Sequence, residues 1–222
     1  MAPGAAEQAA SDLPVPAEGP RFRRYPREQR RAMLIEAGLA CLARGGIGEF
    51  TVDRICREAG ASRGLITHHF GSMDGLMAAV YAEMYDRMLG LAGPAEGVGP
   101  DLPGIIEAVL SDDIIDRPSL NAWLALWGEV ANNPSLQAEH RRHYDLYGAQ
   151  VSAAIRRHAT GRAVDAESLT VMFISLVDGL WLERCIDPGR LSGDAARAAC
   201  YGLLEAFLGP LDRGAEQRST AP

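Results

Sequence analysis

The 222-residue sequence contains no lysine, so all 22 of its basic side chains are arginine. That suits bidentate contacts to phosphate or guanine, although a composition rich in Ala, Gly, Pro and Arg is more simply a codon-usage effect. No stretch of about 18 apolar residues occurs, which argues against a transmembrane helix and favours a cytoplasmic protein. The 4 cysteines form no Cys-x-x-Cys pair. Scattered cysteines of this kind are typical of reduced, buried thiols.

Common catalytic motifs are also missing, since there is no Gly-x-Ser-x-Gly, no P-loop and no dinucleotide fingerprint. One cluster, Glu139, His140 and His143, has a spacing that could hold a divalent metal on one side of a helix. It leaves a small helical metal-dependent enzyme as an alternative, although such a trio is usually solvated surface and a His-Glu-x-x-His motif is absent. Apart from this alternative, we expect that the protein is not an enzyme and binds no cofactor.

Charge is distributed unevenly along the chain. Residues 21–73 hold ten arginines and five carboxylates, a net charge of +5, so the remainder must carry −12 to give the formal total of −7. Such asymmetry indicates a nucleic-acid surface, because contacts to phosphates supply much of the sequence-independent affinity for DNA.

Two short helices around a tight turn are predicted between residues 51 and 70. Thr51 is a suitable N-cap for the first helix, and Gly60 stands where that helix must end with a residue that tolerates positive φ. Ser62 supplies a second N-cap, after which Leu65 and Ile66 give the next helix an apolar side. This is the spacing of a helix-turn-helix, in which the second helix enters the major groove.

Residues expected to touch DNA follow from that geometry. Arg63, Thr67 and His68 project outward from the second helix. The full set of candidate DNA contacts is Arg23, Arg24, Arg27, Thr51, Ser62, Arg63, Gly64, Thr67, His68 and His69. Because similar turns also join purely structural helices, the turn alone leaves a helical hairpin without a DNA role as an alternative.

The segment from about Pro26 to Leu91 resembles the N-terminal domain of TetR-like transcriptional repressors. The matching residues are Phe50-Thr51-Val52, the run from Ala59 to Ile66, and His69-Phe70-Gly71-Ser72. The sequence departs from the family pattern at Met73, where a phosphate-directed lysine is usual, and at Thr67 and His68, where a tyrosine is usual. The resemblance implies a repressor that binds double-stranded DNA at an operator.

We expect an all-α protein in which an N-terminal three-helix helix-turn-helix domain is joined to a larger helical effector-binding and dimerisation domain. The predicted boundaries are a disordered tail at 1–20, the DNA-binding domain at 21–72, the second domain at 73–210 and a tail at 211–222. The predicted helices begin near Pro26 and at Thr51 and Ser62, and continue as Ser72 to Leu91, Leu102 to Ile115, Pro118 to Ala131, Pro134 to Ala159, Asp165 to Ile186 and Ser192 to Leu208. The helix after Ser72 belongs to both domains and is the expected mechanical link.

The last two predicted helices are apolar around most of their circumference. A helix of this kind must be buried on more than one side, which predicts a second subunit packed against it. The residues expected at this dimer interface are Phe173, Leu176, Leu180, Leu204 and Phe207. TetR-like proteins dimerise in this way, and a two-fold dimer implies a palindromic operator.

A second resemblance concerns Trp123 to Trp127 and Asp178 to Leu182. These segments resemble the C-terminal domain of Bet-type repressors, the TetR-like subgroup that responds to choline. Quaternary ammonium groups are held by aromatic faces and a carboxylate. The predicted effector site therefore consists of Trp123, Trp127, Tyr144, Tyr147, Asp178 and Trp181, with Glu129 and Glu183 as further carboxylates nearby. The alternative is that these aromatic residues are ordinary core. Together these features predict a ligand-responsive repressor whose effector is a small ammonium compound such as choline.

Overall fold

The computed structural model describes residues 25–91, 99–111 and 116–212, and this part of the chain is helical, without strands. The elements are α1 (Arg27–Gly45), a short 3-10 helix η1 (Gly46–Glu49), α2 (Val52–Glu58), α3 (Arg63–Phe70), α4 (Met73–Leu91), α5 (Leu102–Val109), α6 (Arg117–Val130), α7 (Pro134–His158), α8 (Ala166–Ile186) and α9 (Gly193–Leu208). The predicted all-α fold class is therefore confirmed. None of these helices is both long and apolar enough to cross a membrane.

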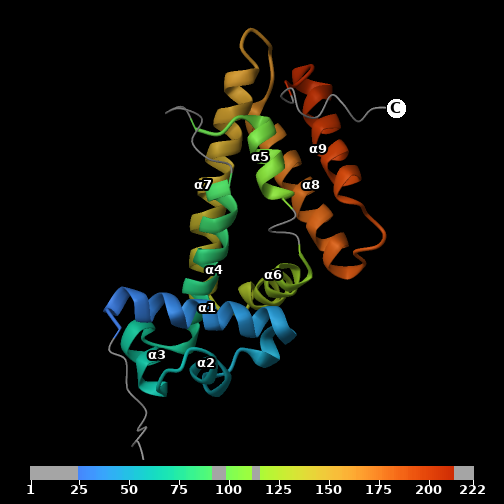
Figure 1. Cartoon of the computed structure of the whole chain (residues 1–222). Helices are drawn as coiled ribbons and strands as arrows, with labels where there is room; N and C mark the ends of the chain where they lie inside the picture. Colours follow the sequence, from blue (N-terminus) through green and yellow to red (C-terminus); the bar gives the residue numbers. More distant parts are fainter. Residues whose placement is uncertain (1–24, 92–98, 112–115, 213–222) are drawn as a thin grey trace, which may run out of the picture.

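The helices are arranged in two connected parts (Figure 1). α1 lies across the base of the molecule with α2 and α3 beneath it, and α4 rises from that base alongside α7. α8 and α9 run side by side at the other edge of the upper part, and α6 lies between α8 and α1. Since α4 packs against α1 and α3 as well as α7, it joins the two parts as a continuous rod.

Most helix starts agree with the predicted caps. Ser72 Oγ accepts a hydrogen bond from Gly75 N at 3.0 Å, and Asp165 and Ser192 cap α8 and α9 in the same way. Thr51 and Ser62 stand at the N-cap positions of α2 and α3 with extended backbones, but neither side chain makes a capping hydrogen bond. The helix-turn-helix is therefore positioned by packing rather than by these two hydroxyls.

The turn within this motif depends on glycine, because Gly60 has φ +55° directly after α2. Another glycine allows α1 to approach α4 closely. A Cβ added at Gly38 would lie 2.8 Å from Val80 Cγ2 and 3.0 Å from Phe50 Cε2. Larger side chains at position 38 would separate the DNA-binding helices from the connecting rod.

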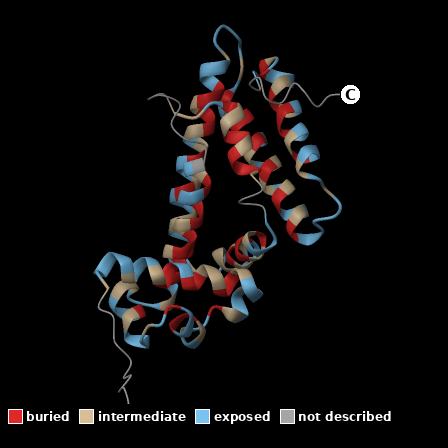
Figure 2. Ribbon diagram, viewed as in Figure 1, coloured by how far each residue is buried: buried red, intermediate tan, exposed pale blue. Residues whose placement is uncertain are grey.

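A continuous core runs through both parts of the molecule (Figure 2). In the lower part it includes Leu34, Leu42 and Ile55, and in the upper part it includes Phe173 and Leu204. Because α1 packs on α6 and α4 packs on α7, the two parts share their interface rather than being joined by a loose linker. A displacement in one part must therefore be accommodated by the other.

One predicted helix ends earlier than expected, and some predicted features lie outside the described residues. α5 ends at Val109 rather than reaching Ile115, and residues 112–115 lie outside the described residues. The predicted DNA contacts Arg23 and Arg24 also lie outside the described residues. So do the predicted tail at 1–20 and residues 213–222 of the predicted tail at 211–222. All four cysteines are buried free thiols.

Candidate effector cavity and DNA-binding face

The outer side of α3 carries the residues predicted to read DNA. Arg63, Gly64, Thr67 and His68 are exposed there, as are Thr51 and Ser62 at the helix starts, whereas His69 is only half exposed. Arg63 forms an ion pair with Asp53 of α2 across the turn at 2.5 Å, and both side chains remain largely open to solvent. An exposed pair of this kind contributes little to stability. The arginine can therefore exchange this partner for a phosphate or a base at small cost.

The first turn of α1 lies at the same end of the molecule. Arg27 is exposed there, and the Arg31 guanidinium lies 5.3 Å from the centre of the Phe70 ring at the end of α3. Such a cation–π contact helps to fix α1 relative to the recognition helix.

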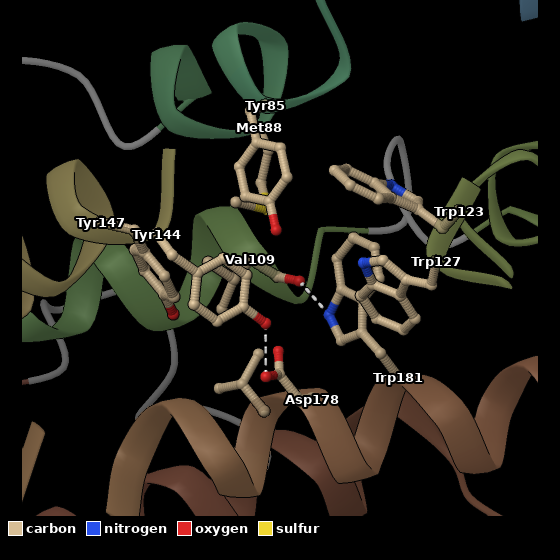
Figure 3. Close-up of a pocket in the computed structure, with 10 residues that line it drawn as sticks. Tyr85, Met88, Val109, Trp123, Trp127, Tyr144, Tyr147, Asp178 and Trp181 are labelled. Atoms are coloured by element: carbon tan, nitrogen blue, oxygen red, sulfur yellow. Dashed lines mark hydrogen bonds between the residues drawn. The ribbon is translucent and has the colours of Figure 1, made fainter. Parts of the chain in front are cut away.

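All six residues predicted to bind an effector line one cavity in the upper part of the molecule (Figure 3). The lining residues are Tyr85 and Met88 from α4, Val109 from α5, Trp123 and Trp127 from α6, Tyr144 and Tyr147 from α7, and Val177, Asp178 and Trp181 from α8. Five helices thus converge on it. Tyr85 and Met88 cannot be identified as lining residues from the sequence, because α4 is apolar on several sides and its pattern does not show which side meets α6 and α8.

The aromatic rings around the cavity hold one another in place. Trp123 meets Tyr85 edge-on with ring centres 4.8 Å apart, and it meets Trp181 edge-on at 5.3 Å. Trp181 is further fixed by its Nε1, which donates a hydrogen bond to the Val109 carbonyl oxygen at 2.9 Å. Edge-to-face pairs of this kind add to the energy of simple burial. The rings are therefore arranged before any ligand arrives.

Asp178 supplies the only carboxylate among the lining residues. Its Oδ2 accepts a hydrogen bond from the Tyr144 hydroxyl at 2.5 Å (Figure 3), and it forms no ion pair within the described residues. Burial raises the pKa of the Asp178 carboxyl, and the hydrogen bond from Tyr144 partly opposes that rise. The other two candidate carboxylates, Glu129 and Glu183, do not line the cavity.

Two polar groups of the cavity lining lack a partner. The Tyr147 hydroxyl oxygen and Trp127 Nε1 are buried and have no hydrogen bond in the described structure. Buried groups without partners are uncommon in folded proteins. The free volume between the lining side chains is about 20 Å³, enough for a single water molecule and too small for an ammonium compound. Ligand binding in this cavity requires the lining side chains or helices to move apart.

Two tyrosine–histidine pairs connect α7 to α4 beside the cavity. The Tyr81 hydroxyl of α4 lies 2.6 Å from His140 Nδ1 of α7, and the His140 ring centre lies 4.2 Å from that of Tyr144. One turn further along, Tyr85 stacks on His143 with ring centres 5.0 Å apart. A chain of contacts therefore leads from Asp178 through α7 to the connecting rod.

Comparison with known proteins places this architecture in a family. Residues 34–80 match the model of the bacterial regulatory proteins of the tetR family, and residues 101–209 match that of the BetI-type transcriptional repressor C-terminal domain. The HTH-type transcriptional regulator BetI 2 of Chromohalobacter salexigens is 30% identical over 189 residues, which is 81% of this chain and 88% of that protein. The chain belongs to the TetR family of transcriptional regulators.

Solved structures agree with this assignment. A transcriptional regulator from Pseudomonas aeruginosa PAO1 is 34% identical, with a TM-score of 0.73, covering 84% of this chain and 93% of that one. A regulator from Saccharomonospora viridis, solved in complex with choline, is 20% identical, with a TM-score of 0.67, covering 80% of this chain and 96% of that one. At that identity the second likeness shows the shared fold.

For this TetR-family regulator the alternative of a metal-dependent enzyme is wrong, because the family consists of transcriptional regulators. The three residues behind that alternative make ordinary protein contacts, among them one between His143 Nε2 and Glu139 Oε2 at 3.5 Å. His140 pairs with Tyr81, Glu139 forms an ion pair with Arg142 at 3.0 Å, and His143 is buried between α7 and α4. The described residues contain no group of three side chains suited to hold a metal ion.

The residues predicted to form a dimer interface of this regulator divide into two sets. Phe173 and Leu204 are fully buried within the protomer, while Leu176 and Leu180 are half-buried and Phe207 is exposed. The large apolar side chains that α8 and α9 do expose are Val171, Met172, Leu182, Ile186 and Phe207. Phe173 and Leu204 therefore belong to the core of the protomer, while Leu176, Leu180 and Phe207 remain accessible to a partner.

Proposed function

We propose that this TetR-family regulator is a repressor that binds a palindromic operator as a homodimer and responds to a small ammonium compound such as choline. The observation that carries the effector class is the cavity in which three tryptophans and three tyrosines surround one carboxylate, Asp178, that has no positively charged partner among the residues the structure describes. The choline bound to the regulator of similar fold from Saccharomonospora viridis supports the same class.

The physical reason is charge compensation in a poorly hydrated site. An ammonium ion loses hydration energy when it enters, and aromatic faces return roughly 0.5 to 2 kcal/mol each. A partly buried carboxylate without an ionic partner is costly even when it accepts a hydrogen bond, as Asp178 does from Tyr144, so a cation that pairs with it relieves part of an existing cost. A neutral ligand of the same shape gains neither the cation–π attraction nor the ion pair with Asp178.

Binding can influence DNA because the cavity wall includes α4. With about 20 Å³ free, a ligand must displace lining groups such as Tyr85 and Met88. α4 begins beside the recognition helix α3, so its displacement changes the position of α3. We infer that the ligand prefers one arrangement of α4 over the other, which is the only way in which it can shift operator binding.

The proposed two-fold arrangement is supported by the large apolar side chains that α8 and α9 expose, which favour self-association. In such a dimer the two copies of α3 would read half-sites roughly 34 Å apart, or a multiple of it. Arg63, Thr67 and His68 would supply the base contacts and Arg27 a phosphate contact.

The effector is tested by calorimetric titration with choline, tetramethylammonium and 3,3-dimethylbutan-1-ol, a neutral analogue of choline. We expect the two cations to bind and the alcohol to bind at least tenfold more weakly, a difference of about 1.4 kcal/mol. Asp178→Asn should abolish this preference, whereas Glu129→Gln, which removes a carboxylate outside the cavity, should not. Binding of the alcohol without binding of any ammonium compound would refute the proposed effector class.

The DNA-binding role is tested by selecting an operator from random duplexes and footprinting it. Replacing Arg63, Thr67 and His68 together with alanine should remove the preference for that operator and leave helicity unchanged. Arg141→Ala, which removes an exposed arginine of α7, serves as the control. Retention of the same operator preference by the triple variant would show that α3 does not read the bases.

A further inference from the structure

The Tyr144–Asp178 hydrogen bond joins two different helices at the cavity wall. Tyr144 projects from α7 and Asp178 from α8, and the phenol donates to Oδ2 at 2.5 Å (Figure 3). The donor and acceptor are both partly buried. A hydrogen bond to a charged acceptor in such surroundings is stronger than one between neutral groups.

The surroundings of Asp178 offer little else to favour its charged form. The titratable groups that face it are tyrosines, Tyr81 and Tyr85 from α4 and Tyr144 and Tyr147 from α7. The contributions from α5 and α6 to the cavity are Val109, Trp123 and Trp127, and α9 brings only the Cys200 thiol near Tyr147. Burial raises the pKa of all four tyrosines, so they are neutral phenols at neutral pH.

The nearest histidine in this chain of contacts does not alter that balance. His140 touches the Tyr144 ring rather than Asp178, and burial lowers its pKa below the ordinary value. It therefore loses its charge at a lower pH than an ordinary imidazole does. Within the described residues, Tyr144 is the single hydrogen-bond donor to Asp178.

The consequence concerns ligand choice. A protonated Asp178 would be a neutral hydrogen-bond donor and would attract no cation, whereas the ionised form selects a positive charge. We propose that Tyr144 is the residue that determines the charge selectivity of this cavity, by holding Asp178 in its ionised form so that ammonium ligands are preferred over neutral ones. This inference rests on the proposed function for its ligand class, but the charge of Asp178 can be measured without any ligand.

The direct test is a carbon-13 NMR titration of the Asp178 carboxyl in the full-length protein labelled at aspartate. The resonance is assigned by its absence in Asp178→Asn. Tyr144→Phe keeps the ring and its packing against His140 and Tyr85 while removing the donor. We expect the midpoint to rise by about one to two pH units, the range for losing one hydrogen bond to a charged group. Tyr147→Phe, whose hydroxyl has no partner, should leave it unchanged.

A second variant guards against a folding defect in Tyr144→Phe. Incorporation of 3-fluorotyrosine at position 144 keeps the hydroxyl and makes it more acidic, hence a stronger donor, so the midpoint should fall instead of rise. If neither substitution moves the midpoint, Tyr144 does not control the charge of Asp178 and the inference is wrong.

The ligand experiment separates this inference from the proposed function. Choline is permanently charged, so any pH dependence between pH 6.5 and 9 comes from the protein. Below the carboxyl midpoints of both proteins, Tyr144→Phe should bind choline about tenfold more weakly than the wild type for each pH unit by which its midpoint is raised, and above both midpoints the two affinities should become equal. Asp178→Asn should bind weakly throughout. A wild type that binds no ammonium ligand would refute the proposed effector class, and the carboxyl midpoint would then decide the role of Tyr144 by itself.

Discussion

Replacing Tyr81 with phenylalanine tests how the cavity communicates with the DNA-binding helices. Tyr81 is fully buried on α4, and its hydroxyl lies 2.6 Å from His140 Nδ1 on α7. Phenylalanine keeps the ring contacts with Tyr85 and Trp123, whose ring centres lie 5.0 and 5.8 Å away. The change therefore removes the hydrogen bond between the helices, together with the longer one that the Tyr81 hydroxyl donates to the Tyr85 hydroxyl at 3.4 Å, without opening a cavity.

The expected magnitude is set mainly by the shorter of these two bonds, the one between the helices. A hydrogen bond of this kind contributes about 0.5 to 1.5 kcal/mol net, and the half-exposed His140 can regain a water molecule, so we expect the free energy of unfolding to fall by about 1 kcal/mol or less. If the hydrogen bond between Tyr81 and His140 forms in only one arrangement of α4, its loss changes the free energy that couples ligand binding to operator binding by up to about 1 kcal/mol. That corresponds to a change of up to roughly fivefold in the ligand's effect on operator affinity.

The assay is fluorescence anisotropy of a labelled operator with and without saturating choline, accompanied by urea unfolding. Tyr201→Phe is the matched control, because its hydroxyl donates to Glu107 Oε1 at 3.1 Å between α9 and α5, away from α4. It should cost comparable stability and leave the coupling unchanged. Equal coupling in the wild type and both variants would refute the route through Tyr81 and His140.

Two further predictions concern assembly and pH. Ile186→Glu changes an α8 side chain that is 67% exposed in the protomer, so the variant should stay folded and sediment as a monomer in analytical ultracentrifugation. Leu204→Glu changes a buried side chain and should unfold the protein. A dimeric Ile186→Glu variant would show that the interface lies elsewhere. Burial, followed by the nearby Arg142, lowers the pKa of His143, against the opposing effects of Asp86 and Glu139. The unfolded chain therefore binds the proton more tightly, and stability should decline as pH falls below 6.5 by at most about 1.4 kcal/mol per pH unit for this group. When urea unfolding is measured from pH 5 to 8, the free energy of unfolding should change less steeply with pH for His143→Gln than for the wild type. An equal pH dependence in the two proteins would contradict this role of His143.

The sequence was sufficient to predict most helices, because their starts and ends carry local signals. Asp165 and Ser192 cap the helices they were expected to cap, and Gly60 adopts the positive φ that the turn requires. Local signals were insufficient for the hydroxyls of Thr51 and Ser62, which stand at the predicted positions without making capping hydrogen bonds. Residue type fixes a capping preference, whereas the bond itself depends on the side-chain rotamer.

Orientation of the apolar helices could not be predicted in the same way. α8 and α9 are apolar around most of their circumference, so periodicity does not show that Phe173 and Leu204 face inward while Ile186 faces outward. The same ambiguity on α4 concealed Tyr85. Packing against other helices decides these orientations, and it involves residues far apart in the sequence.

The most direct measurement is the operator affinity of the wild-type protein as choline is added, with 3,3-dimethylbutan-1-ol and the Asp178→Asn variant as comparisons. We predict that choline changes the dissociation constant of the operator complex by at least about fivefold, the lower end of ordinary allosteric coupling. The neutral alcohol, and choline added to Asp178→Asn, should change it by less than about twofold. If the operator complex of the wild type is insensitive to choline and to every other ammonium compound while the alcohol alters it, the cavity does not act as a cation sensor.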